Sequence, residues 1–209
     1  MSIVIVDYGV GNLESIRNML KRIGHSCQIT SDIEDVKNAS KLILPGVGAF
    51  QQAMTKLERL NMIPALNEAV MEKKVPILGI CLGMQLFATQ SEEGGLVEGL
   101  NWINSTVKKF NYQRLNASNL KVPNVGWRWV HSYKNKSVFK NCKSDPKYYF
   151  VHSYYMDCND SDDVLALSHY GLEFTAAVYK GNITGVQFHP EKSHKYGMKI
   201  LDEFANDDD

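Results

Sequence analysis

The sequence lacks an excess of charge of either sign. Lysine plus arginine and aspartate plus glutamate number 23 each in 209 residues, and the basic residues are scattered. Binding to nucleic acid is therefore not expected. The beginning, MSIVIVDYG, lacks the basic region and long apolar core of a signal peptide, and no apolar run approaches the roughly 20 residues that span a bilayer. We expect a soluble cytoplasmic protein that binds no membrane.

Cysteine is sparse, and its spacing excludes two kinds of site. Cys27, Cys81, Cys142 and Cys158 form no C-x-x-C pair and have no histidines at zinc-finger spacing. We expect neither a disulfide framework nor a metal, and no pattern calls for a cofactor. A reducing compartment leaves the thiols free, which makes chemistry at Cys81 possible.

The first half of the chain has the pattern of alternating strands and helices. Apolar runs predict strands at 2–7, 26–30, 41–45 and 75–80. Amphipathic segments predict helices at 12–24, 49–60 and 62–73, the first with Asn12 as its N-cap and Gly24 as its end. This alternation indicates a parallel sheet with helices on both faces.

The second half, after about residue 91, has a different texture. Aromatic and β-branched runs with short connections are typical of antiparallel or mixed sheet, and a last helix is predicted at 194–205. We therefore expect one α/β domain over 1–209. Its sheet is predicted to be mixed, mostly parallel and flavodoxin-like, with antiparallel strands added by the second half.

The stretch VPILGICLGMQLF, residues 75–87, places Cys81 between Gly79 and Gly83. An apolar strand, Gly-x-Cys-x-Gly and then a helix are typical of a nucleophile elbow, and we expect that helix to cover 82–90. The helix N-terminus would favour the thiolate. An isolated buried cysteine is more often a small hydrophobic residue, so this interpretation requires a base.

Of six histidines, only His189 has a built-in acidic partner. In GVQFHPEKS, His189 and Glu191 lie two apart at a predicted strand end, so both side chains project to the same side. Glu191 would orient the imidazole, which leaves its other nitrogen for the thiol proton. A strand-end histidine beside a solvent-facing glutamate is the alternative. His152, in FVHSYY, lacks an acidic neighbour.

The segment LPGVG, residues 44–48, predicts a loop whose amides face a cavity. The N–H of Val47 or Gly48 would stabilise an oxyanion beside the N–H of Leu82. A simple loop before a helix is the alternative.

Together these blocks carry a family signature. LPGVGAF, GICLGMQLF…SEEGG and GVQFHPEKS, in this order, resemble the class I, triad-type glutamine amidotransferases. DYGVGNL, VGW and YFVHSYY make the chain similar to the glutaminase subunits of imidazole glycerol phosphate synthase, from histidine biosynthesis. The resemblance covers nearly the whole chain. It implies that Cys81 attacks the carboxamide of glutamine to form a thioester, while His189 protonates the departing ammonia.

The resemblance also implies binding residues. Around the substrate L-glutamine it places Gly48, Gln85, Glu93, Ser153 and Tyr154. On the rim facing a partner it places Asn12, Trp127, Tyr149 and Lys192.

The implied partner is a separate (β/α)₈-barrel cyclase. It would receive ammonia through a tunnel within a heterodimer and make imidazole glycerol phosphate and an aminoimidazole-carboxamide ribotide (AICAR). One residue departs from the family pattern, because Arg128 follows VGW where asparagine is usual. It leaves open a second acceptor, a sugar amidotransferase of surface-polysaccharide synthesis.

Three remoter hypotheses remain at this point. The loop after the first strand, Gly9-x-Gly11, could belong to a dinucleotide-binding module, although Glu14 stands where the third glycine is needed. A cysteine peptidase and a catalytically inactive binding subunit are the others. All three triad residue types are present, which disfavours the last.

Overall fold

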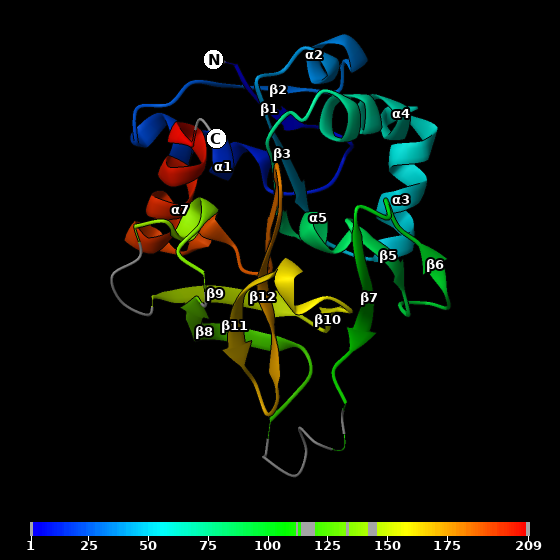
Figure 1. The fold of residues 1–209 in the computed structure, drawn as a ribbon, viewed down its shortest axis with the longest axis vertical. Coiled ribbons are helices and arrows are strands. Elements are labelled where there is room, and N and C mark those ends of the chain that lie inside the picture. Colours follow the sequence, from blue (N-terminus) through cyan, green and yellow to red (C-terminus); the bar gives the residue numbers. More distant parts are fainter. Residues whose placement is uncertain (1, 112, 114–119, 133, 142–145, 208–209) are drawn as a thin grey trace.

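The computed structural model describes residues 2–111, 113, 120–132, 134–141 and 146–207. The predicted thiol at Cys142 lies outside these residues. Figure 1 shows a large sheet between two groups of helices, with α1 and α7 on one side and α3 and α4 on the other.

The first half alternates strands and helices, as the sequence predicts. Its elements are β1 (Ile3–Val6), α1 (Leu13–Arg22), β2 (Cys27–Thr30), α2 (Ile33–Lys37), β3 (Lys41–Gly46), α3 (Phe50–Arg59), α4 (Met62–Asn67) with a π-helical turn (Glu68–Glu72), β4 (Ile77–Cys81) and α5 (Leu82–Gln85).

The second half is mostly strands. Its elements are β5 (Ala88–Ser91), β6 (Val97–Glu98), β7 (Ile103–Lys109), β8 (Asn124–Ser132), β9 (Lys147–His152), β10 (Tyr154–Cys158), β11 (Val164–His169), β12 (Glu173–Lys180), β13 (Ile183–Val186) and α7 (His194–Asn206). Short 3₁₀ turns lie at Ser137–Phe139, Ser161–Asp163 and Pro190–Lys192.

The main sheet of the described chain has nine strands in the order β2-β1-β3-β4-β13-β12-β11-β8-β9. Strands β2, β1, β3, β4 and β13 run parallel, and the remaining strands continue the sheet antiparallel. The predicted mixed α/β fold is thus confirmed. The carboxyl ends of β3, β4 and β13 meet at one edge, which is where open α/β sheets place their ligand sites.

Two hydrophobic cores lie on opposite faces of the sheet. Successive side chains of β1 point to opposite faces of the sheet. Val4 and Val6 pack in the core beneath α3 and α4, whereas Ile3 and Ile5 pack in the core that includes residues of α1 and α7. Burial on both faces explains why the parallel strands read as continuous apolar runs.

Several expectations about local structure were wrong. The helix after Cys81 ends at Gln85 instead of running to residue 90, because Leu86 and Phe87 carbonyls accept hydrogen bonds from Leu100 and Trp102 and the chain turns into β5. Asn12 does occupy the N-cap position of α1, as predicted, but its side chain makes no capping hydrogen bond and only its carbonyl accepts, from the Ile16 amide.

The second half also forms a separate sheet that the sequence did not indicate. Four strands, in the order β10-β7-β5-β6, pair beside the main sheet. The short helix α2 was not expected either, although Asp32 caps it by accepting hydrogen bonds from the amides of Glu34 and Asp35.

Candidate active site

Cys81 ends β4 in a strained backbone conformation. Its φ of 56° and ψ of −111° lie where side-chain-bearing residues are uncommon. A Cβ on Gly83 would lie 1.8 Å from the carbonyl oxygen of Leu44, and one on Gly79 would lie 2.6 Å from the ring of Phe87. Both flanking glycines are therefore required by close packing, and the turn they permit has the geometry of a nucleophile elbow.

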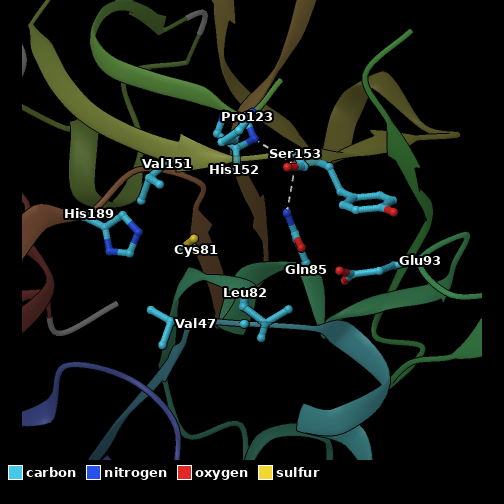
Figure 2. Close-up of a pocket in the computed structure, with 12 residues that line it drawn as sticks. Val47, Cys81, Leu82, Gln85, Glu93, Pro123, Val151, His152, Ser153 and His189 are labelled. Carbon is cyan, nitrogen blue, oxygen red and sulfur yellow. Dashed lines mark hydrogen bonds between the residues drawn. The ribbon is translucent and has the colours of Figure 1, made fainter. Parts of the chain in front are cut away.

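His189 and Glu191 form a buried pair. Nδ1 of His189 lies 2.8 Å from Oε1 of Glu191, and both side chains are 2% exposed. The main chain of His189 is fixed as well, because its amide donates to the carbonyl of Tyr149 and its carbonyl accepts from the hydroxyl of Ser193. In Figure 2 the imidazole faces the same cavity as the sulfur of Cys81.

The charges at this pair favour a protonated imidazole. Burial by itself lowers the pKa of His189, but the ionised Cys81 sulfur and the Glu191 carboxylate outweigh it and raise that pKa to about 10. Nε2 of His189 has no hydrogen-bond partner of ordinary geometry among the described residues and is the nitrogen left to interact with the Cys81 sulfur. A protonated imidazole facing the Cys81 sulfur is the state that these charges favour.

These groups open into one cavity of about 330 Å³. Its lining comes from α5, from the ends of β4, β9 and β10, and from the segments that follow β3, β5 and β13 and precede β8. The lining residues are Val47, Gly48, Cys81, Leu82, Gln85, Glu93, Pro123, Val151, His152, Ser153, Tyr154 and His189. The structure thus brings together the residues predicted to act as nucleophile, base, oxyanion donors and substrate ligands, with Glu191 behind the imidazole.

Two of the predicted substrate ligands, Gln85 and Glu93, are held by their own hydrogen bonds. Nε2 of Gln85 donates to the carbonyl of Tyr154 at 2.9 Å, across the cavity in Figure 2. Oε2 of Glu93 accepts from the amide of Phe50, the first residue of α3, at 2.8 Å. Both side chains are therefore oriented before any ligand binds.

His152 contributes a neutral imidazole to the same wall. Burial is the largest cause that lowers its pKa, to about 4, and the charges of His189 and Arg128 act in the same direction. Its Nδ1 lies 2.7 Å from the carbonyl of Tyr154, and its Nε2 lies 2.9 Å from Nδ2 of Asn124. Because a carbonyl can only accept, Nδ1 carries the proton.

Three of the four predicted rim residues form one cluster. The ring of Trp127 stacks on His194 with a 5.5 Å centroid separation and meets Tyr149 edge-on, while Nζ of Lys192 lies 6.0 Å from the Tyr149 ring centre. Asn12 is exposed immediately before α1 and is not part of these ring contacts. Since Tyr149 also accepts the His189 amide, this rim cluster is joined directly to the candidate base.

Arg128, the residue that departs from the family pattern, folds back onto its own chain. Its guanidinium lies 4.8 Å from the ring centre of Tyr170 and donates to the carbonyls of Trp127 and Val125. Its charge is therefore engaged by neighbouring strand residues and the Tyr170 ring.

Two buried polar residues at the site escaped the sequence analysis. His152 lacked an acidic neighbour in sequence, and its partners come from other segments. Gln187 is fully buried and donates from Nε2 to Sγ of Cys81 at 3.7 Å. Its position two residues before His189 was the available signal, because alternate residues of an extended segment share a side.

Comparison with known proteins gives the family. The model of the glutamine amidotransferase class-I family matches residues 4–207. The chain belongs to this family. Within it, the chain is 46% identical to imidazole glycerol phosphate synthase subunit HisH of Leptospira borgpetersenii and 49% identical to subunit HisH 2 of Methanococcus maripaludis. Each match covers 97% of this chain and 98% of the relative, which places the chain with the HisH subunits.

Solved structures agree on the fold of this glutamine amidotransferase. The structure of PurLQS from Thermotoga maritima matches with a TM-score of 0.74 at 17% identity, over 98% of this chain and 97% of that one. A glutamine amidotransferase from Thermotoga maritima matches with a TM-score of 0.65 at 15% identity, over 99% of this chain and 83% of that one.

Two other kinds of feature are absent from the part of the chain that the structure describes. No group of histidine, cysteine or acidic side chains there could hold a metal ion. No helix of these residues is long and apolar enough to cross a membrane.

Proposed function

We propose that this chain hydrolyses glutamine through Cys81, His189 and Glu191 and passes the ammonia to a separate synthase subunit. The whole described chain serves as one glutamine amidotransferase domain. The observation that carries the proposal is the cavity in which a sulfur on a strained elbow meets an imidazole whose far nitrogen is held by a buried carboxylate. Cys, His and Glu in these roles constitute a nucleophile, an acid–base group and its orienting partner.

The reaction begins with attack of the Cys81 thiolate on the side-chain carboxamide carbon of glutamine. The carbonyl oxygen becomes an oxyanion, which the amides of Leu82 and of Val47 or Gly48 stabilise. The His189 imidazolium gives its proton to the departing nitrogen, so ammonia leaves and a γ-glutamyl thioester remains. Neutral His189 then takes a proton from water, the hydroxide adds to the thioester, and glutamate leaves as the thiolate is restored.

The lining of the cavity matches an amino-acid substrate. The carboxylate of Glu93 is suited to the α-ammonium group, and Ser153 and Tyr154 lie on the opposite wall, where they would bind the α-carboxylate. Gly48 and Gln85 would contact the carboxamide. The cavity admits glutamine, and an internal peptide segment lacks the free α-ammonium and α-carboxylate groups that these residues would bind.

Ammonia is lost to water unless it passes directly to an acceptor, so the proposal includes a partner. Exposed aromatic rings on β8 support a docking face beside the rim cluster, since Trp127 is 38% and Trp129 is 52% exposed. The relatives are named as subunits of imidazole glycerol phosphate synthase. We propose that the partner is a (β/α)₈-barrel cyclase that makes imidazole glycerol phosphate and AICAR.

The observations that raised the alternatives have local explanations. Arg128, which leaves open a sugar amidotransferase as acceptor, contacts Tyr170, Trp127 and Val125 of its own chain. The loop after β1 suggested a dinucleotide, but Nζ of Lys56 donates to the carbonyl of Gly9, and Glu14 pairs with Arg17.

The direct test replaces the nucleophile in the complex with a barrel cyclase. Cys81→Ala should abolish glutamine-dependent synthesis of imidazole glycerol phosphate and leave synthesis from ammonium salts unchanged, because only the ammonia source is removed. Cys158→Ala, on β10 outside the cavity lining, is the matched control. Glutamine hydrolysis by Cys81→Ala would overturn the proposed chemistry, and failure of the cyclase to use ammonia from the unmodified chain would overturn the proposed acceptor.

A further inference from the structure

We infer that Gln187 is a positioning residue. Its side chain donates a hydrogen bond to the Cys81 sulfur and fixes the orientation of the Gln85 side-chain amide. This inference rests on the proposed glutaminase function and adds to it a residue outside the triad and outside the cavity lining. It connects the nucleophile to the substrate side of the cavity through a chain of two side-chain amides.

The sheet register places Gln187 beside Cys81. Strands β13 and β4 pair in parallel, with Val186 opposite Ile80, so the next residues along the two segments, Gln187 and Cys81, lie side by side. The amide of Gln187 donates to the carbonyl of Ala176, which fixes its main chain. The side chain is fully buried and therefore needs partners for its polar atoms.

The direction of each hydrogen bond follows from one carbonyl. The Tyr154 carbonyl can only accept, so the group of Gln85 that faces it, at 2.9 Å, is the NH₂. The same nitrogen lies 2.8 Å from the side chain of Gln187, which must present its oxygen there. The NH₂ of Gln187 is then left to face the Cys81 sulfur, at 3.7 Å.

This chain of amides has two chemical consequences. A donor aimed at sulfur stabilises the thiolate more than the thiol, because hydrogen bonds to a charged acceptor are stronger. On the other side, both hydrogens of the Gln85 NH₂ are committed to Tyr154 and Gln187, so only its carbonyl oxygen remains for a ligand. That oxygen selects a substrate group that donates, such as a primary carboxamide, over a carboxylate.

The prediction concerns the ionisation of Cys81, and other groups face the same sulfur. His189 approaches from the loop after β13, Tyr8 comes from the loop after β1, and His152 and Glu93 line the cavity. A substitution at Gln187 removes none of these four groups. Gln187→Met removes only the donor, so a change in the thiol of that variant can be assigned to the lost donor.

The experiment measures the rate at which iodoacetamide alkylates Cys81 as a function of pH, read from the mass of the peptide that contains it. Gln187→Glu keeps an acceptor for Gln85 but offers the sulfur a negative charge and no donor. We expect its alkylation midpoint to rise by about one pH unit or more. Gln187→Met, which has no donor and no charge, should shift the midpoint in the same direction by less. Gln52→Glu makes the same charge change on the exposed face of α3 and should shift nothing.

A second measurement, the steady-state kinetics of glutamine hydrolysis, tests whether Gln187 orients the Gln85 amide for the substrate. In Gln187→Met the Gln85 amide loses one of its two fixed partners, so KM for glutamine should rise, while loss of the donor to the Cys81 thiolate should lower kcat. If Gln187→Glu does not fold, as judged by circular dichroism, Gln187→Met alone decides. An unchanged midpoint in the folded variants would refute the inference. An unchanged midpoint, together with glutamine hydrolysis that still depends on Cys81, refutes the role of Gln187 only. Glutamine hydrolysis that survives Cys81→Ala refutes the proposed glutaminase function itself.

Discussion

The two sides of the cavity are built by different means. On the nucleophile side, Cys81 is fixed by backbone strain and by the close packing of Gly79 on Phe87 and of Gly83 on the Leu44 carbonyl of β3. On the base side, His189 is held by separate hydrogen bonds, to Glu191 and Ser193 nearby in sequence and to Tyr149 on β9. The difference suggests that the elbow tolerates almost no change in shape, whereas the base side loses function in smaller steps as single hydrogen bonds are removed.

The substitution expected to disrupt the Cys81 elbow most is Gly83→Ala. The added Cβ would lie 1.8 Å from the Leu44 carbonyl oxygen, so the backbone of β3 or of the elbow has to move. We expect the free energy of unfolding to fall by at least about 3 kcal/mol, and glutaminase activity to fall by more than about 10²-fold through misplacement of the nucleophile.

Its matched control is Gly181→Ala. Gly181 has a φ of 59° and open space around its Cβ position, so that variant carries only the cost of the left-handed conformation, about 1–2 kcal/mol. Chemical denaturation compares the two. Equal losses of stability, with activity retained in Gly83→Ala, would contradict the claim that close packing fixes the elbow.

On the base side, Glu191→Gln is expected to have the next largest effect. The carboxylate helps to raise the pKa of His189 to about 10, and the imidazolium is the acid that protonates ammonia. Removing the negative charge lowers that pKa, so the alkaline limb of kcat/KM, near pH 10 in the parent, should move to lower pH. Activity at neutral pH should fall on the order of 10²-fold.

The shift of the alkaline limb is measured from the pH dependence of kcat/KM for the complex. Glu58→Gln, on the exposed face of α3, makes the same change in charge and should leave the profile as it was. An alkaline limb that stays in place in Glu191→Gln would show that Glu191 does not control the protonation of His189.

The smallest effect is expected at His152. His152→Phe keeps a ring among its aromatic neighbours but removes the donor to the Tyr154 carbonyl. One neutral hydrogen bond is worth about 1 kcal/mol, so KM for glutamine should rise by roughly fivefold to tenfold. Because its pKa of about 4 keeps His152 neutral, the shape of the pH profile near neutrality should not change.

His169→Phe, at the exposed end of β11, controls for the loss of a histidine. A His152→Phe variant whose profile changes shape between pH 5 and 8 would show that His152 titrates there, contrary to the neutral form that its burial favours.

The same difference between the two sides explains how much the sequence could predict. The elbow is local, so Gly-x-Cys-x-Gly after an apolar strand was enough to place Cys81, and the two-residue spacing was enough to pair His189 with Glu191. The length of the helix after Cys81 was not predictable, because distant amides of Leu100 and Trp102 compete for its carbonyls. Gln187 and His152 were missed for a related reason, since their partners are set by strand register and by contacts between distant segments.

The measurement that tests the central claim most directly is the site of labelling by a chloroketone analogue of glutamine. The analogue carries its electrophilic carbon where the carboxamide stands, so the thiolate should capture it covalently. We predict one label per chain, on the peptide that contains Cys81, with labelling slowed by excess glutamine and strongly reduced in His189→Ala. Labelling that spares Cys81, or that glutamine does not slow, would contradict the account.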